Sequence, residues 1–327
     1  MVTSAIRHRV ALAGFTALAL TAGPSFGETA KVAQGTAASE GAMQTELKDA
    51  VQFNWGFQGQ TQGAGTPNEI GIGGFLPLSF GANSVFFLDA LSNINLADIG
   101  NSSSIINTEV AGTTISTSTR LGYRWLNGNR SWMYGINAGY DSRPMATGQA
   151  DTGVTVVNPR TVFFQQVAAG LEAASDSLSL NAYALVPVGT REYALNNIYG
   201  GGSLQTYGLD AGYSITPAFK ASIGYYYQDG DLNSADGSGV RGRLAYNISN
   251  GLTVGANLSY DQAYNTRLSA DLKYRFGSND FGAPKSQNPP VRPVIQALSS
   301  TPANRDVRVH DCSSCWDSCG WYTPSCY

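Results

Sequence analysis

Cysteines are the residues of this chain that most readily suggest chemistry, and all four lie in its last sixteen residues. Their spacing is Cys-x2-Cys-x3-Cys-x6-Cys, which lacks the two paired knuckles and the intervening loop of a usual zinc site. In an exported chain, disulfides are the more common use of such a cluster. We therefore expect disulfides and no metal, and the candidate residues are Cys312, Cys315, Cys319 and Cys326.

Histidine, the commonest general base, is nearly absent from the chain. His8 lies close to the N-terminus, and His310 immediately precedes the cysteine cluster. The region 51–277 has neither His nor Cys, so the usual base and the thiol nucleophile of hydrolases and proteases are missing there. Carboxylates alone remain possible, but no spacing pairs them. We expect no enzyme and no cofactor.

Alternation predicts the elements that position the remaining polar residues. In LTVGANLSYD (252–261), apolar and polar residues alternate without a break, which indicates a strand with one apolar and one polar face. The pattern recurs from Val51 to Phe276. It predicts twelve strands, near 51–60, 69–79, 84–97, 113–125, 131–142, 162–174, 177–188, 203–215, 218–228, 239–248, 251–261 and 266–276.

Charged residues occupy only the polar face of these strands. A Lys or Arg facing lipid at mid-depth would cost about 2–4 kcal/mol, so we expect the charges to face an enclosed lumen. They either form a basic stripe that selects anionic solutes or pair as a structural network, and seven bases against six acids favour pairing. The expected lumen residues are Asp89, Arg120, Arg124, Asp141, Glu172, Asp210, Lys220, Arg241, Arg243, Asp261, Asp271, Lys273 and Arg275.

Three features favour lipid rather than a dry core on the apolar side. The polar face is rich in Gly, Ser and Asn, aromatic residues gather at strand ends, and the last strand ends on the barrel-closing residues Tyr274 and Phe276. Tight turns alternate with longer polar segments at 98–112, 143–161, 189–202 and 229–238, as on the two rims of an outer-membrane barrel. The predicted fold is all-β, a transmembrane antiparallel β-barrel of about twelve strands with a short disordered C-terminal tail.

The flanks of the barrel region are predicted from composition. Residues 1–27 have the basic start and short apolar core of a secretory signal peptide, and 28–50 are expected to be a periplasmic linker. A Pro-rich linker is expected at 278–311 and a Cys-rich tip at 312–327. Loss of Arg7 and Arg9 with the leader lowers the net charge from −3 to −5, which argues against a nucleic-acid partner.

Four stretches of the barrel region are distinctive: FLPLSFGANSVFFLDA (75–90), STRLGYRWLNGNRSWMYGINAGYDSR (118–143), QVAAGLEAASDSLSLNAYALVPVG (166–189) and NTRLSADLKYRFG (265–277). Together they resemble the β-barrel domain of inverse autotransporters of the intimin and invasin type. The resemblance covers about 51–277. It implies a twelve-stranded barrel that anchors in the outer membrane, with a linker that threads the pore and displays a C-terminal adhesive passenger.

The resemblance leads to two hypotheses about function. The first is an outer-membrane anchor or translocator that displays a very short C-terminal tail, and the alternative is a passive channel for small solutes. The tip itself is expected to be either a displayed module or a docking peptide in the periplasm. The expected location is the outer membrane of a Gram-negative bacterium, and the expected partners are outer-membrane lipid, the barrel assembly machinery and periplasmic chaperones.

Overall fold

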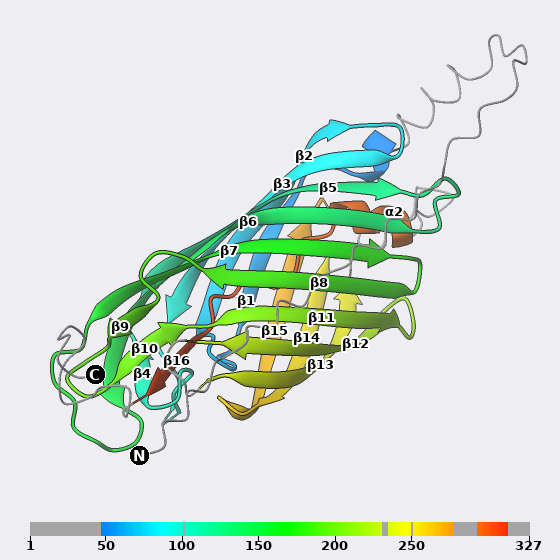
Figure 1. The fold of residues 1–327 in the computed structure, drawn as a ribbon. Helices are drawn as coiled ribbons and strands as arrows, with labels where there is room; N and C mark the ends of the chain where they lie inside the picture. The colour runs from blue at the N-terminus through cyan, green and yellow to red at the C-terminus, as the bar shows by residue number, and fades with distance from the viewer. Residues whose placement is uncertain (1–46, 101, 231–234, 250, 278–292, 313–327) are drawn as a thin grey trace, which may run out of the picture.

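Twelve strands form one closed antiparallel barrel in the computed structural model, which describes residues 47–100, 102–230, 235–249, 251–277 and 293–312 (Figure 1). Consecutive barrel strands pair, and β1 pairs with β15 to close the ring, so the barrel has no free edge. The predicted twelve-stranded barrel is therefore confirmed. Its strands are β1 (Asn54–Gln60), β2 (Asn68–Phe80), β3 (Ser84–Leu96), β5 (Thr114–Leu126), β6 (Met133–Ala150), β7 (Thr161–Ala174), β8 (Leu178–Pro187), β11 (Gln205–Ser214), β12 (Phe219–Asp229), β13 (Gly237–Ser249), β14 (Leu252–Asp261) and β15 (Asn265–Phe276).

The two faces of the wall follow the alternation of the sequence. Outward side chains are apolar and exposed, as with Leu268 at 72% and Ile223 at 67%. Inward side chains along the middle of the wall are mostly polar, and Arg120 and Asp141 are each 1% exposed. A continuous apolar outer surface of this extent is stable against acyl chains and unfavourable in water. Among the described residues, none of the helical segments has the length and apolar character of a membrane-spanning helix.

The barrel has a short-turn rim and a long-loop rim (Figure 1). The short-turn rim carries the connections 81–83, 127–132, 175–177 and 215–218, together with both ends of the barrel sequence. The long-loop rim carries the connections 61–67, 97–113, 151–160 and 188–204. Because the strand number is even, the chain leaves the barrel on the rim where it entered.

Strand β6 is longer than the sequence predicted. It runs for 18 residues to Ala150, through the first half of the segment 143–161 that was expected to be a loop, so that expectation is wrong there. The polar character of this segment predicted a loop, but the inward Met145 is buried in an apolar cluster at the long-loop rim. The end of β6 pairs with β4 (Thr108–Ala111), and β9 (Glu192–Ala194) and β10 (Gly200–Ser203) lie in another predicted loop.

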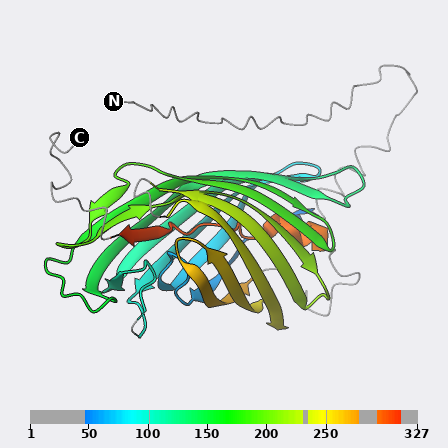
Figure 2. The same ribbon diagram turned by 60° about the horizontal axis from the view of Figure 1, so that its bottom comes forward.

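The segment after the barrel returns through the lumen. Residues 278–311 were predicted as an extended linker, but within the described part α2 (Pro293–Gln296), η1 (Ala297–Ser299) and β16 (Val309–Cys312) are regular structure. The amide N–H of Val294 donates to Asp176 Oδ1 at the short-turn rim (3.2 Å), whereas β16 pairs with β10 at the long-loop rim. Figure 2 shows this segment crossing the inside of the barrel. Residues 293–312 are called the luminal segment below.

An apolar cluster packs the luminal segment against one side of the barrel wall at the short-turn end of the lumen. Val294 and Leu298 of the luminal segment pack there with Phe75 and Phe87 of the barrel wall. Leu47 joins them from a helical turn over 47–50, the described end of the predicted periplasmic linker. The luminal segment is therefore fixed at its entry by burial of apolar side chains, as a core element would be.

Candidate functional site

Arginines of the barrel wall hold the luminal segment by its main chain. Arg124 Nη1, on β5, donates to the carbonyl oxygens of Leu298 (3.1 Å) and Ser300 (2.6 Å). Four residues earlier on β5 and on the same face, Arg120 Nη2 donates to the carbonyl of Asn304 (3.2 Å). The acceptors are main-chain carbonyls, so these bonds hold an extended chain whatever its side chains are.

Neighbouring strands continue this contact toward the long-loop rim. Arg143 Nη1, on β6, donates to the carbonyl of Val307 (2.7 Å), and Gln166 Nε2, on β7, donates to that of Asp306 (3.3 Å). The wall made by β5, β6 and β7 therefore contacts the main chain over most of the height of the lumen. A polypeptide passing here satisfies its carbonyl groups on the barrel instead of on water.

Two arginines of the luminal segment fix its register through their side chains. Arg305 Nη2 donates to Asp89 Oδ1 (2.7 Å), and Arg308 Nη2 donates to Asp261 Oδ2 (3.0 Å). The Arg308 guanidinium also lies over the ring of Tyr264, 5.0 Å from its centroid. Sliding the segment by one residue would leave both buried carboxylates without a cation, which is strongly destabilising.

Strand β16 closes the contact at the long-loop rim. The carboxylate of Asp311 accepts hydrogen bonds from the amide N–H groups of Asn107 (2.8 Å) and Thr108 (2.6 Å). Burial raises the pKa of Asp311 to about 6, which outweighs the opposite effect of these hydrogen bonds. Burial also lowers the pKa of His310 next to it. This end of the segment is therefore folded into the cap of the barrel.

Three ion pairs inside the barrel each pass over a glycine. Arg124 of β5 and Glu172 of β7 lie on either side of Gly135 in the same cross-strand row, with Arg124 Nε 2.6 Å from Glu172 Oε2. A Cβ on Gly135 would lie 2.8 Å from Glu172 Oε2 and 2.9 Å from Arg124 Cγ. The missing side chain lets the pair reach across a whole strand while lying flat on the wall.

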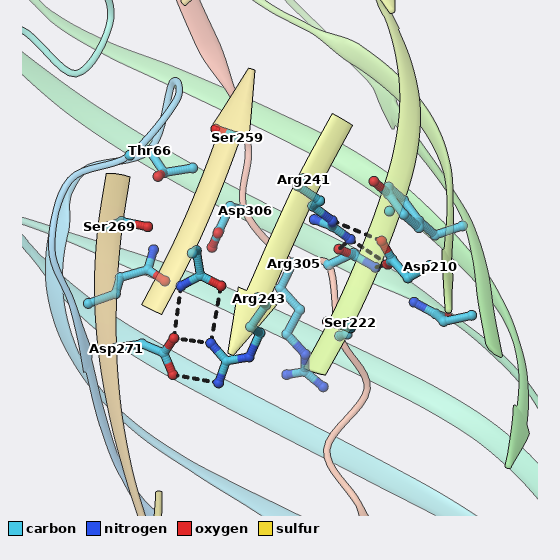
Figure 3. Close-up of a pocket in the computed structure, with 18 of the residues that line it drawn as sticks. Thr66, Asp210, Ser222, Arg241, Arg243, Ser259, Ser269, Asp271, Arg305 and Asp306 are labelled. Carbon is cyan, nitrogen blue, oxygen red and sulfur yellow. Dashed lines mark hydrogen bonds and ion pairs between the residues drawn. The ribbon is translucent and has the colours of Figure 1, made fainter. Parts of the chain in front are cut away.

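The opposite wall repeats this arrangement. Asp210, Gly224 and Arg241 form one row across β11, β12 and β13, and Arg241 Nε donates to Asp210 Oδ1 (2.9 Å). Arg243 of β13 and Asp271 of β15 pair over Gly255, with Arg243 Nη2 2.9 Å from Asp271 Oδ1. Figure 3 shows both pairs on the wall of a cavity.

A cavity of about 430 Å³ lies between this second wall and the luminal segment. Its lining comes from β1, β8 and β11–β15 on one side and from residues 301–306 and 308 on the other. The wall supplies hydroxyl and amide groups such as Ser222, Ser269 and Asn257, as well as the two ion pairs. The lumen is thus filled against β5–β7 and hollow along much of the opposite wall, which the luminal segment contacts at Thr301, Asn304 and Arg308.

The thirteen predicted lumen residues fall into three groups. Four bases pair with four acids of the set, and Asp89 and Asp261 pair with the luminal segment instead. Arg275 contacts Thr301, Lys273 lines the cavity, and Lys220 is exposed at the short-turn end of β12. The four pairs within the set are Arg120–Asp141, Arg124–Glu172, Arg241–Asp210 and Arg243–Asp271.

The other predicted site residues lie where the barrel closes and at the end of the luminal segment. Tyr274 and Phe276 belong to an aromatic group at the closure of the barrel, where the ring of Phe276 stacks on that of Trp55 at 4.6 Å. Cys312 ends β16 and is disulfide-bonded. Cys315, Cys319 and Cys326 lie outside the described residues, as do the signal peptide 1–27 and most of the linker 28–50. No group of residues in the described ranges could hold a metal ion.

Several residues of the site were missed by the sequence reasoning. The run NRDVRVHD (304–311) supplies most of them, and its density of charge within a Pro- and Ser-rich stretch was the available signal. Arg143 was missed because it follows the predicted end of its strand, and Glu69 because it starts one. The missed residues are Glu69, Arg143, Arg305, Asp306, Arg308 and Asp311.

Comparisons with known proteins find solved structures of similar fold but no family. No family model matches the sequence, and no curated protein matches it. A structure from a study of in-meso crystallisation of membrane proteins is 12% identical, with a TM-score of 0.53, over 79% of this chain and 99% of that chain. An outer membrane channel from Pseudomonas putida F1 is 12% identical over 68% of this chain and 94% of that chain, with a TM-score of 0.42.

An enzyme is also among the similar structures. Outer membrane phospholipase A from Escherichia coli is 13% identical over 68% of this chain and 90% of that chain, with a TM-score of 0.36. At such identities the likeness is one of fold alone. The closed barrel, its apolar outer surface and its charged lumen define this chain as an outer-membrane β-barrel protein of the Gram-negative type.

Proposed function

We propose that the protein is an outer-membrane anchor that threads its own C-terminal segment through its barrel and presents the residues beyond Cys312 at the outer face. The observation that carries this proposal is the path of the luminal segment, from Val294 at the short-turn rim to β16 at the long-loop rim. In outer-membrane barrels the short turns are periplasmic and the longer loops extracellular. The segment therefore points outward.

The proposal agrees with the resemblance to inverse autotransporters noted from the sequence. In that family a linker threads the pore and displays a passenger. Here the displayed part would be the Cys-rich tip, 312–327, of which Cys312 is already in a disulfide. Compared with a passive channel, this function accounts for the arginines that hold main-chain carbonyls, which an open pore does not need.

The contacts of the luminal segment suit a permanent rather than a passing occupant. Arg305 and Asp89 are 7% and 1% exposed, and loss of one member of such a buried pair costs about 3–5 kcal/mol. Apolar burial of Val294 and Leu298 adds to this. As partners we propose outer-membrane lipid around the barrel, and periplasmic chaperones and the barrel assembly machinery during its insertion.

Access of an antibody to an epitope tag on intact cells tests the proposal. A tag after Tyr327 should be labelled on intact cells. The matched control is the same tag inserted at Gly128, in the short turn between β5 and β6, which should be labelled only after the outer membrane is permeabilised. Labelling of the C-terminal tag only after permeabilisation would contradict the proposal, because the tip would then be periplasmic.

A further inference from the structure

We infer that the barrel carries a second activity: a narrow aqueous passage beside the docked luminal segment, open to small hydrophilic solutes and monovalent salt ions. The inference goes beyond anchoring, since it concerns the half of the lumen that the segment leaves empty. Its basis is the 430 Å³ cavity, which is far larger than the ~10–15 Å³ that one water molecule requires.

The cavity follows the height of the barrel instead of forming a closed pocket at one level. Along β8 its lining includes Ser179, Asn181, Tyr183 and Leu185, which are the alternate inward positions from near the short-turn rim to near the other end of the strand. At the long-loop rim the lining continues with residues 63, 64 and 66 of the β1–β2 connection. Solute therefore meets one continuous hollow along the strands.

The wall of this hollow is built to stay flat. Arg241–Asp210 and Arg243–Asp271 lie against the sheet because the residues beneath them are Gly224 and Gly255. A side chain at either glycine would overlap the ion pair and push it toward the axis of the barrel. Hydroxyl and amide groups fill the space between the pairs, so the surface suits water and small polar solutes (Figure 3).

Fixed charges along the passage largely cancel. Arg241, Arg243, Arg305 and Arg308 line it, and each is paired with an aspartate. Among the described residues, Lys273 is a lining cation with no hydrogen bond or ion pair, and both Asp271 of β15 and Asp306 of the luminal segment lie within electrostatic reach of it. A wall of this kind should pass both anions and cations, with little selectivity.

Single-channel recording of the full chain in a planar bilayer tests the passage. We expect a small, steady conductance, which Ser222→Trp and Ser269→Trp should each lower to about half or less by narrowing the hollow. The matched controls are Ile223→Trp and Leu268→Trp, on the same strands but facing lipid, and they should leave the conductance unchanged. A full chain with no conductance would overturn the inference, as would insensitivity to both inward tryptophans.

A tethered variant separates this passage from transient departure of the segment. Ser203 of β10 and Val309 of β16 are cross-strand partners, and such pairs lie within the Cα separation that a disulfide spans. In Ser203→Cys/Val309→Cys, with the new disulfide verified by peptide mapping, the conductance should persist. Loss of conductance on oxidation and its return on reduction would show that the current needs an undocked segment, and would overturn the inference.

The two proposals fail separately in these experiments. The tag experiment measures whether the C-terminus reaches the cell surface and does not depend on ion flow. The recordings measure ion flow while the luminal segment is tethered in the barrel. A surface-labelled tag with a closed barrel would leave the anchor in place and remove the passage.

Discussion

The two walls of the lumen use the same chemistry and differ in what faces it. On the wall of β3, β5, β6 and β7, the guanidinium groups of Arg120 and Arg124 are each 1% exposed beneath the luminal segment. On the wall of β8 and β11–β15, Arg241 and Arg243 are 35% and 29% exposed to the cavity. The comparison indicates that one cross-strand device, an arginine and a carboxylate over a glycine, serves docking on one side and an open surface on the other.

Burial should determine how much each of these ion pairs contributes to the free energy of unfolding. Arg124 has two tasks, neutralising Glu172 and donating to two carbonyls of the segment, and both are shielded from water. Arg241 lies beside a hollow that admits water, and its one hydrogen bond to the segment goes to the side-chain oxygen of Asn304. The largest difference between the walls should therefore appear when an arginine is removed from each.

The variants Arg124→Met and Arg241→Met test this difference most directly. Arg124→Met should lower the free energy of unfolding by about 3–5 kcal/mol, because it leaves the partly buried Glu172 carboxylate and two carbonyls of the segment without their donor. Arg241→Met should cost less, about 1–2 kcal/mol, because water reaches its pair and only one hydrogen bond to the segment, at Asn304, is lost with it. Urea titration of the barrel in detergent micelles, followed by gel mobility without boiling, gives both values. Equal losses would mean that burial does not distinguish the walls.

The protonation of Asp311 gives the next largest effect, and it acts only on the docked side. The folded-state pKa of Asp311 is about 6, above the ordinary 3.8, so the folded state binds a proton more tightly than the unfolded state. The stabilisation is complete below about pH 4 and is lost as the pH rises to about 6, an effect of roughly 3 kcal/mol. His310 changes in the opposite direction, because its pKa is lowered.

A difference measurement isolates Asp311 from His310. The free energy of unfolding of wild type minus that of Asp311→Asn, measured between pH 4 and 7, should fall as the pH rises. The histidine contributes equally to both proteins and cancels. A flat difference would show that the carboxyl group at β16 titrates alike in the folded and unfolded chains.

The barrel was predictable from the sequence because the environment of its side chains alternates regularly along each strand. Every wall strand has one face in lipid and one in a polar lumen, so alternation marks each of them, and the ends differ by at most three residues except at the end of β6. Even the glycine rows leave a trace in the sequence. In the hairpin around 127–132, pairing Leu126 with Met133 places Gly135 opposite Arg124.

The luminal segment was not predictable, because nothing about its environment is periodic. Val307 and Val309 are buried in the cap, Arg305 and Arg308 face opposite walls, and the intervening carbonyls are held by barrel arginines. Main-chain contacts leave no mark on residue type. A Pro-rich stretch held in this way has the composition of a linker while it packs as part of the lumen.

A methyl group at one glycine of each wall sharpens the comparison further. Gly135→Ala should cost about 1–3 kcal/mol, since the Arg124–Glu172 pair lies under the docked segment and has nowhere to move. Gly224→Ala should cost less, about 1 kcal/mol, since the Arg241–Asp210 pair can move toward the cavity at the expense of its hydrogen bonds with Asn304. The same urea titration reads both. A larger loss for Gly224→Ala would mean that the hollow gives the pair no freedom.

The smallest effect concerns the charge of the hollow wall. Lys273→Gln removes a lining cation that has no hydrogen bond or ion pair among the described residues, and leaves one positive charge fewer beside Asp271 and Asp306. The passage should then favour cations, which the reversal potential in a KCl gradient measures, while the free energy of unfolding changes by less than about 1 kcal/mol. Lys220→Gln, at the exposed end of β12, is the control and should leave the reversal potential near that of wild type, because the residue lies outside the cavity lining. An unchanged reversal potential in Lys273→Gln would mean that ions do not pass along this wall, and the contrast between a docked and an open side would then be one of packing alone.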